Sequence, residues 1–257
     1  MRDITYPAVI LAAKGAFKAL GLKFQMSGTD NVPRQGGAIL ALNHISYVDF
    51  IFGGLTVLPS ERVVRFMAKR ELFDHRFSGP LMRSLHHICV DRADGIASYA
   101  KGVEYARAGE IVGIFPEATI SRSMDLKELK TGTVRMAAEA GVPLIPAIVW
   151  GTQLMYTKDH PRDFSRGRTI ALTVGEPFHP TGDNSVKDTA RLRATMTELL
   201  DRTVAAYPLS PQGQWWAPAR LGGTAPAPQE ALRLDAEEKR RRAKERSAKR
   251  AAKLERG

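Results

Sequence analysis

Short apolar runs typical of buried strands alternate with longer segments of helical periodicity along this chain, and no other feature constrains the fold as strongly. Ala38–Leu42 is an uninterrupted apolar run, typical of a strand covered on both faces. Similar runs occupy residues 22–26, 63–67, 88–90, 111–115, 144–149 and 169–174. Helical patterns occupy residues 46–58, 71–85, 96–108, 131–140 and 186–206. The alternation predicts an α/β domain whose central, mostly parallel or mixed sheet is flanked by helices.

Composition and length predict one large domain with appendages. The chain has 257 residues, of which 44% are hydrophobic and 25% charged, so it can build a sizeable core. We assign residues 25–207 to the domain and residues 208–228 to a segment rich in proline, glycine and tryptophan. The pattern of residues 1–24 predicts an amphipathic helix, which either docks on a membrane or packs on the domain. Residues 229–257 predict a basic tail, helical or disordered.

The charge of the chain predicts an anionic partner. The net charge is +11, and residues 229–257 carry 11 Lys and Arg against 6 Asp and Glu. Phosphates, nucleic acid and an acidic membrane surface all fit such a balance. Cys89 is the one cysteine, so an internal disulfide cannot form. No stretch reaches the roughly 20 apolar residues that a membrane-spanning helix needs, and we find no secretory signal.

His44 and Asp49, directly after the Ala38–Leu42 run, are the first pair of candidate catalytic residues. In one continuous helix their side chains would lie about 140° apart and could not meet. If the chain turns after His44 and a helix starts at Ser46, the carboxylate reaches back to the imidazole. A histidine held in this way can remove a proton from an alcohol near neutral pH. The alternative is that Asp49 only caps a helix.

Polar residues follow other predicted strands as well. Arg92 leaves the strand at 88–90 and suits a bidentate grip on phosphate, unless it pairs with a nearby carboxylate. Glu117 follows the strand at 111–115 and either accepts hydrogen bonds from substrate hydroxyls or forms a structural salt bridge. Lys130 precedes a predicted helix start, where a lysine and free N–H groups favour an anion, although a surface lysine is the simpler alternative. Loops at strand ends are where α/β proteins place their sites.

Several common sequence motifs of nucleotide-binding proteins and hydrolases are absent from the sequence. It has no Gly-x4-Gly-Lys phosphate loop, no Gly-x-Gly-x-x-Gly, no Gly-x-Ser-x-Gly and no His-Glu-x-x-His. Cysteines and histidines are not clustered in a way that predicts a metal site. We therefore expect neither a metal nor a cofactor.

Four ordered blocks together resemble the glycerolipid acyltransferase family, most closely its bacterial 1-acylglycerol-3-phosphate acyltransferases. The blocks are Asn43-His44-x4-Asp49, Val90-Asp91-Arg92, Phe115-Pro116-Glu117-x-Thr119 and Val142-Pro143-Leu144-Ile145-Pro146. The resemblance covers roughly residues 25–180. The family's third block usually reads Phe-Pro-Glu-Gly-Thr-Arg, whereas this chain has Ala118 and Ile120 in place of the glycine and the arginine.

The resemblance implies a role for each matching residue. His44 is the base, and Asp49 orients it. The acceptor's glycerol phosphate is bound by Arg92 and by the block formed by Glu117, Ala118 and Thr119, with a contribution from Lys130. Arg122 can reach the same phosphate from two positions beyond Ile120.

The activity that the resemblance implies is transfer of a fatty acyl chain from acyl-CoA or acyl carrier protein to 1-acylglycerol 3-phosphate, which makes phosphatidic acid. The expected partners are this thioester, the lysophospholipid acceptor and an anionic membrane surface, with no specific nucleic acid. The expected location is peripheral, on the cytoplasmic face of the plasma membrane. Glycerol 3-phosphate, another lysophospholipid or a glycosylated lipid are alternative acceptors. A non-catalytic basic protein that binds membranes or RNA is the alternative of another class.

Overall fold

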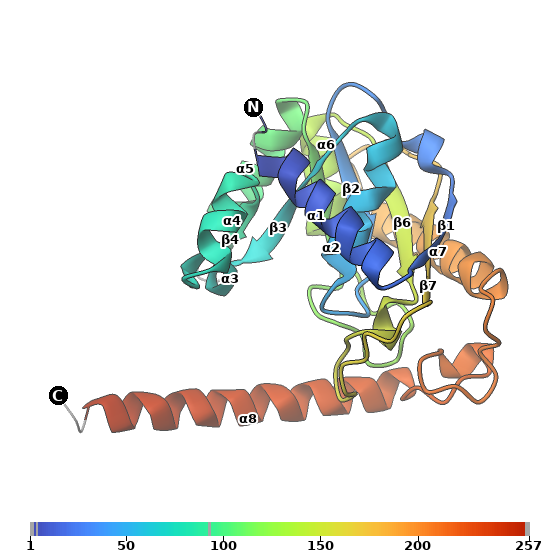
Figure 1. Cartoon of the computed structure of the whole chain (residues 1–257). Helices are drawn as coiled ribbons and strands as arrows, with labels where there is room; N and C mark the ends of the chain where they lie inside the picture. The colour runs from blue at the N-terminus through green and yellow to red at the C-terminus, as the bar shows by residue number, and fades with distance from the viewer. Residues whose placement is uncertain (1–2, 4, 92–93, 255–257) are drawn as a thin grey trace.

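The computed structural model describes residues 3, 5–91 and 94–254. Helices and strands alternate through most of this length (Figure 1). The elements are α1 (Thr5–Ala19), β1 (Lys23–Ser27), η1 (Thr29–Asn31), β2 (Ala38–Leu42), α2 (Asp49–Gly53), η2 (Gly54–Ser60), β3 (Val64–Lys69), α3 (Arg70–Asp74), α4 (Ser78–Ser84), β4 (Ile88–Val90), α5 (Gly95–Arg107), β5 (Ile111–Ile114), α6 (Gly132–Ala140), β6 (Leu144–Trp150), η3 (Thr152–Leu154), β7 (Thr169–Val174), α7 (Ser185–Ala205), η4 (Ala219–Leu221) and α8 (Pro228–Leu254).

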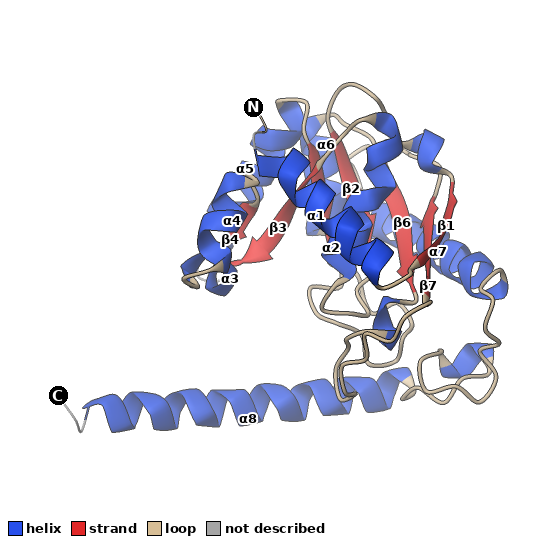
Figure 2. Ribbon diagram, in the orientation of Figure 1, coloured by secondary structure: helices blue, strands red, loops and turns tan. Residues whose placement is uncertain are grey.

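The strands form a single mixed sheet in the order β1-β7-β6-β2-β5-β3-β4 (Figure 2). All neighbouring strands are parallel except β6 and β7, which are antiparallel. β2 lies between β5 and β6, near the middle of the sheet. The predicted α/β class with a mostly parallel, mixed sheet is therefore confirmed.

Alternate residues of β2 enter two different hydrophobic cores, because successive side chains of a strand point to opposite faces. Leu40 and Leu42 pack on one face with residues of α2 and, at its edge, with Phe17 of α1. Ile39 belongs to the other core, which the helices α5, α6 and α7 cover. Both faces are thus closed, which explains why β2 reads as an uninterrupted apolar run.

Two predicted helices differ from the structure. Residues 46–58 form only the short helix α2, followed by the 3-10 helix η2, which contains Pro59. The pattern at 71–85 divides into α3 and α4, and the break precedes α4 rather than falling at Pro80. Proline is tolerated in the first turn of a helix, where its missing N–H has no partner to lose.

The N-terminal helix is shorter than residues 1–24 suggest, because α1 ends at Ala19 and β1 begins at Lys23. Phe17 stacks on Phe52 of α2, with ring centroids 5.2 Å apart, which fixes the end of α1 to the domain. Leu11 remains exposed on the outer side of the helix. None of the helices in the described part of the chain is long and apolar enough to span a bilayer.

The segment that follows α7 is pinned to the domain by its tryptophans. Trp216 is buried and meets Trp150 and Tyr207 edge to face, with centroids 6.2 and 6.0 Å away. Trp215 stacks on His160 at 3.7 Å. This anchoring turns the chain so that α8 begins beside the loops at one end of the sheet (Figure 1).

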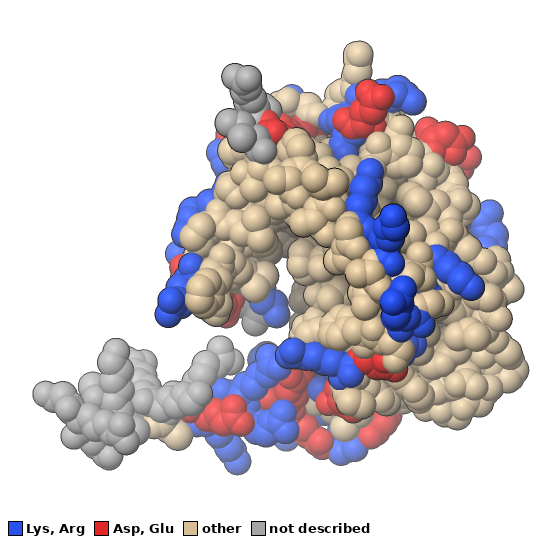
Figure 3. Space-filling model, viewed as in Figure 1, with Lys and Arg blue, Asp and Glu red and all other residues tan. Residues whose placement is uncertain are grey.

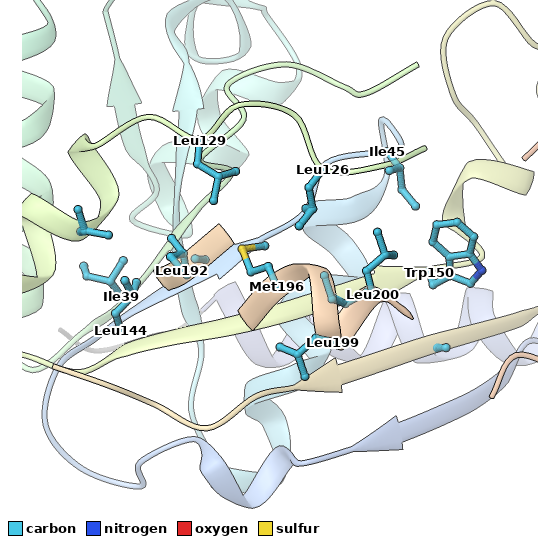
Figure 4. Packing of buried hydrophobic residues seen from close by; sticks show 14 of the residues in the cluster. Ile39, Ile45, Leu126, Leu129, Leu144, Trp150, Leu192, Met196, Leu199 and Leu200 are labelled. Atoms are coloured by element: carbon cyan, nitrogen blue, oxygen red, sulfur yellow. The ribbon is translucent and has the colours of Figure 1, made fainter. Parts of the chain in front are cut away.

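The long loop between β5 and α6 is also anchored. Leu126 and Leu129 insert into the core against Leu192 and Met196 of α7 (Figure 4). Arg193 of α7 adds hydrogen bonds to the carbonyl oxygens of Leu126 and Lys127. The loop is therefore held at both its side chains and its backbone, although it has no regular structure of its own.

Candidate active site

His44 and Asp49 meet directly at the carboxyl end of β2. Nδ1 of His44 lies 2.9 Å from Oδ2 of Asp49. The Asp49 side chain is fully buried, whereas the His44 side chain is 21% exposed. The chain turns over Ser46–Val48 before α2 begins at Asp49, so the carboxylate folds back as the sequence suggests, although the helix starts three residues later than predicted.

Asp49 is fixed by three further donors. The backbone N–H groups of Ile45 and Ser46 both donate to Oδ2 at 2.7 Å. Thr152, at the start of η3, donates its hydroxyl proton to Oδ1 at 2.6 Å. Both oxygens are engaged, Oδ2 by the imidazole and two backbone N–H groups and Oδ1 by the hydroxyl of Thr152. Asp49 can thus hold His44 in one orientation.

Phe115 fixes the plane of the His44 ring. The two rings stack with centroids 4.3 Å apart and an interplanar angle of 27°. Because Nδ1 faces Asp49, Nε2 lies at the opposite edge of the ring and is directed away from the carboxylate. A neutral imidazole whose Nδ1–H donates a hydrogen bond to a carboxylate keeps a free lone pair on Nε2, which is the arrangement of a general base.

Glu117 bridges two parts of the backbone. Its Oε1 accepts a hydrogen bond of 2.8 Å from the N–H of His44, and its Oε2 accepts one of 3.0 Å from the N–H of Lys127. The residue is 4% exposed. Burial raises the pKa of Glu117 to about 8, although both N–H groups and the charge of Lys127 oppose this rise. Both oxygens are therefore engaged by backbone, and the role of Glu117 in binding glycerol phosphate stays a prediction.

Ala118 follows in a left-handed backbone conformation, with φ at 61°. This region favours glycine, so the conformation accounts for the glycine that the family places here. Ala118 is exposed, and Thr119 beside it accepts a hydrogen bond of 2.8 Å from Nζ of Lys127. The turn thus places a hydroxyl and a cation together.

Arg122, Lys127 and Lys158 form a group of cations near these residues, which we call the cation cluster. The backbone N–H of Ser121, next to Arg122, donates to the carbonyl of His44 at 2.7 Å. Lys127 is joined to His44 through Glu117. Lys158 comes from the loop after η3, which follows β6, and β6 lies on the other side of β2 from β5. Two segments distant in sequence, the loop before α6 and the loop after η3, therefore contribute positive charge near the turn that carries His44.

Carboxylates compensate the cation cluster in this structure. Arg122 is 7% exposed and pairs with Asp159 as well as with Asp235 and Glu238 of α8. Lys127 also pairs with Asp235, and Lys158 lies 2.9 Å from Oδ1 of Asp235. Despite the opposing effect of burial, hydrogen bonds from Lys127 and Lys158 hold the pKa of Asp235 below its usual value.

The remaining predicted residues lie differently. Arg92 lies outside the described residues, and Asp91 before it pairs with Arg70 at 2.8 Å. Lys130 is exposed, and its backbone N–H donates to the carbonyl of Pro116. The helix predicted from Thr131 is confirmed, since α6 begins at Gly132 with Thr131 at the N-cap position, where its side chain makes no capping hydrogen bond.

Sequence reasoning missed five residues of this site, which are Lys127, Thr152, Lys158 and the α8 carboxylates Asp235 and Glu238. Lys127 lies between the predicted strand at 111–115 and the predicted helix at 131–140, and its apolar neighbours Leu126 and Leu129 are buried. Thr152 and Lys158 carry no local signal, because they reach the site only through the sheet order. The carboxylates of α8 read as members of a solvated helix. Only the tertiary fold brings them to the cluster.

Comparison with known proteins gives the same picture. The family model described as Acyltransferase matches residues 23–150. A 1-acyl-sn-glycerol-3-phosphate acyltransferase of Bacillus subtilis is 32% identical over 197 residues, which are 76% of this chain and 90% of the relative. The chain belongs to this acyltransferase family. A second acyltransferase of the same description, from Borreliella burgdorferi, is 28% identical over 63% of each chain.

A solved structure supports the fold of this acyltransferase. The 1-acyl-sn-glycerophosphate acyltransferase of Thermotoga maritima superposes with a TM-score of 0.65 at 23% identity, over 77% of this chain and 78% of that one. The matched family model ends at Trp150, so Lys158 and α8 lie beyond it. Family membership favours an enzyme over the non-catalytic alternative. The ion pairs between the cation cluster and α8 involve residues outside the part that the family model matches.

Proposed function

We propose that this acyltransferase moves a fatty acyl chain from acyl-CoA or acyl carrier protein to the free hydroxyl of 1-acylglycerol 3-phosphate, with phosphatidic acid as product. The observation that carries the proposal is the contact of 2.9 Å between His44 and a buried Asp49 that three further hydrogen bonds hold in place. The printed descriptions of the relatives point to the same acceptor.

In the proposed reaction, Nε2 of His44 removes the proton of the acceptor hydroxyl while its oxygen attacks the thioester carbonyl. Asp49 stabilises the imidazolium that results. The tetrahedral intermediate collapses with cleavage of the carbon–sulfur bond, and the departing thiolate takes the proton from His44. The acyl–oxygen bond replaces the acyl–sulfur bond, and no covalent acyl-enzyme is required. General base catalysis of this kind contributes about 10² to 10⁴-fold.

The cation cluster is the proposed site for the acceptor's phosphate. Arg122 offers a planar fork of donors, and Lys127 and Lys158 add point charges, which together suit phosphate oxygens. Lys127 is tied through Glu117 to the backbone of His44, so charge recognition and proton removal are held at a fixed separation. Arg92 and Lys130 stay additional candidates from the family resemblance, as does the turn at Ala118 and Thr119.

The acceptor and the donor's acyl chain are lipids, and we propose that the enzyme works peripherally at the cytoplasmic face of the plasma membrane. Exposed apolar side chains on α1 and on the α3–α4 segment support an approach to a bilayer, among them Leu11, Leu72 and Phe77. Arg70 and Arg76 are exposed in the same α3–α4 segment and favour anionic lipid headgroups.

The test is an acyl-transfer assay with purified chains. His44→Ala and Asp49→Asn should lose about 10² to 10⁴-fold in kcat, while binding of lysophosphatidate in mixed micelles persists. His179→Ala is the matched control, because His179 is exposed on a loop before α7. Normal turnover by His44→Ala would refute the base. A panel of glycerol 3-phosphate, lysophosphatidylcholine and a glycosylated lipid, each with acyl-CoA and acyl carrier protein donors, identifies the acceptor and the donor.

A further inference from the structure

The first half of α8 delivers two carboxylates to the cation cluster. Asp235 and Glu238 are three positions apart, so both lie on one face of the helix. Asp235 contacts all three cations, and Glu238 lies 2.8 Å from Nη2 of Arg122 and 3.3 Å from Nζ of Lys158. The contact is therefore a multidentate one, unlike a single surface salt bridge.

These carboxylates have the charge and the donor set of a phosphate monoester. A phosphate monoester carries a charge of about −1.5 to −2 at neutral pH, and two carboxylates carry a comparable charge. Their oxygens are bound by the guanidinium of Arg122 and the ammonium groups of Lys127 and Lys158. The same donors are those proposed above for the acceptor's headgroup.

The charge of the cation cluster can be balanced by the carboxylates of α8 or by a phosphate, but not by both together. With α8 in place, the three cations face three carboxylates, those of Asp159, Asp235 and Glu238. Without α8 only Asp159 remains, and the site has an excess of two positive charges that fits a phosphate. With α8 covering them, the cations are largely buried, so they need anionic partners in that position.

We propose that α8 is a tethered competitor of the acceptor, with Asp235 and Glu238 occupying the phosphate site until an anionic bilayer draws the helix away. This inference rests on the proposed function, because it takes the cation cluster to be the phosphate site.

The second half of α8 has the opposite charge. Residues 239–257 contain ten Lys and Arg and two Glu. The side chains of Lys239, Arg240 and Arg241 are exposed. In Figure 1, α8 continues past the domain, and Figure 3 shows Lys and Arg side chains, with Asp and Glu between them, along the described part of this helix at the bottom of the view. A basic helix that projects in this way is suited to an anionic lipid surface.

A bilayer fits this half better than RNA does. Phe77, which is 70% exposed, and Leu72 give the α3–α4 segment an apolar surface on the side of the molecule where α8 projects. Apolar side chains next to basic ones favour a membrane interface, whereas RNA would leave them in water. The proposed acceptor is itself delivered by a bilayer.

The experiment compares the full-length chain with Asp235→Asn/Glu238→Gln, which removes the charges and keeps the side-chain sizes. On neutral phosphatidylcholine vesicles, the KM for lysophosphatidate should fall about tenfold in this variant. The matched control is Glu237→Gln/Glu245→Gln, which removes two exposed charges from the same helix and should keep the wild-type KM. Equal KM values in all three chains would overturn the inference and leave the proposed function standing.

Vesicles that contain 30% phosphatidylglycerol test the release. They should lower the KM of the wild-type chain toward that of Asp235→Asn/Glu238→Gln, and Lys239→Gln/Arg240→Gln/Arg241→Gln should lose this response. A fall in KM produced by RNA and not by the vesicles would overturn the bilayer as partner.

Titration calorimetry with sn-glycerol 3-phosphate adds a readout that does not depend on turnover. The Asp235→Asn/Glu238→Gln chain should bind this probe about tenfold more tightly than wild type. If no chain acylates lysophosphatidate and this gain in binding persists, the competition stands and the proposed acceptor is wrong.

Discussion

The hydroxyl of Thr152 donates to Oδ1 of Asp49 at 2.6 Å, although 103 positions separate the two residues. Both side chains are buried. The contact connects β6, after which Thr152 lies, to the turn that carries His44, so the orientation of the base depends on a neighbouring strand.

Thr152→Val should therefore impair turnover and stability together. Valine keeps the shape and removes the donor, which leaves a buried carboxylate oxygen without its partner. We expect a loss of about 1–3 kcal/mol in the free energy of unfolding and about a tenfold drop in kcat, because Asp49 then holds His44 less firmly. Urea denaturation and steady-state kinetics measure the two effects.

Thr157→Val is the matched control for that experiment. Thr157 is also buried, and its hydroxyl donates to the carbonyl of Ile45 at 2.6 Å without touching Asp49. The control should lose comparable stability and retain kcat. Equal losses of kcat in both variants would show that Thr152 has no special role.

The buried carboxyl of Glu117 predicts a pH dependence of stability. Since burial raises its pKa to about 8, the folded chain holds a proton that the unfolded chain releases at lower pH. The free energy of unfolding should thus decrease as pH rises toward 8, by on the order of a few kcal/mol relative to a chain that lacks this group. Glu117→Gln, compared by urea denaturation between pH 5 and 9, should lack this decrease, whereas the exposed Glu128→Gln should keep it. Parallel curves for wild type and Glu117→Gln would contradict the prediction.

The left-handed conformation of Ala118 predicts a stabilising substitution. Ala118→Gly removes a strain of about 1–2 kcal/mol and adds some freedom to the unfolded chain. The net gain in the free energy of unfolding should reach up to about 1 kcal/mol. Ala100→Gly, at an exposed position inside α5, should instead cost about 1 kcal/mol. Thermal unfolding of both variants checks the sign at each position.

Lys127 and Lys158 should matter for binding the acceptor rather than for proton transfer. Lys127→Gln and Lys158→Gln should each raise the KM for lysophosphatidate about tenfold, with kcat within about twofold of its starting value. The Asp235→Asn/Glu238→Gln background suits the measurement, because the carboxylates of α8 do not compete there. Lys187→Gln, exposed at the start of α7, serves as control. A fall in kcat without a change in KM would count against a binding role.

The strands were predictable because their signal is local. Ala38–Leu42 and Ile88–Val90 begin and end as predicted, and Ala38–Leu42 is a plain apolar run because it is buried on both faces. The helix predicted at 46–58 starts only at Asp49, because the chain first turns over Ser46–Val48 while the N–H groups of Ile45 and Ser46 donate to the Asp49 carboxylate. The carbonyl oxygen of Tyr156 accepts hydrogen bonds from the N–H of Tyr47 and the hydroxyl of Ser46, so tertiary contacts also hold this turn against the helical pattern.

The His44–Asp49 pair was predictable from its spacing and its position after a strand, whereas the cation cluster was only partly so. Arg122 was named as a candidate, but Lys158 enters through the order of β2 and β6 in the sheet, which the sequence does not state. The contacts of Asp235 and Glu238 depend on how the tryptophan segment directs α8. Such long-range placements have no periodicity from which to read them.

The bridge formed by Glu117 has a consequence for the size of molecule that this enzyme selects. One rigid side chain joins the backbone of the base to the backbone of a phosphate-binding lysine, so it acts as a gauge between the reacting oxygen and the bound headgroup. Under the proposed function, an alcohol whose hydroxyl stands one carbon nearer to or farther from its phosphate would be gripped and yet left out of reach of the imidazole.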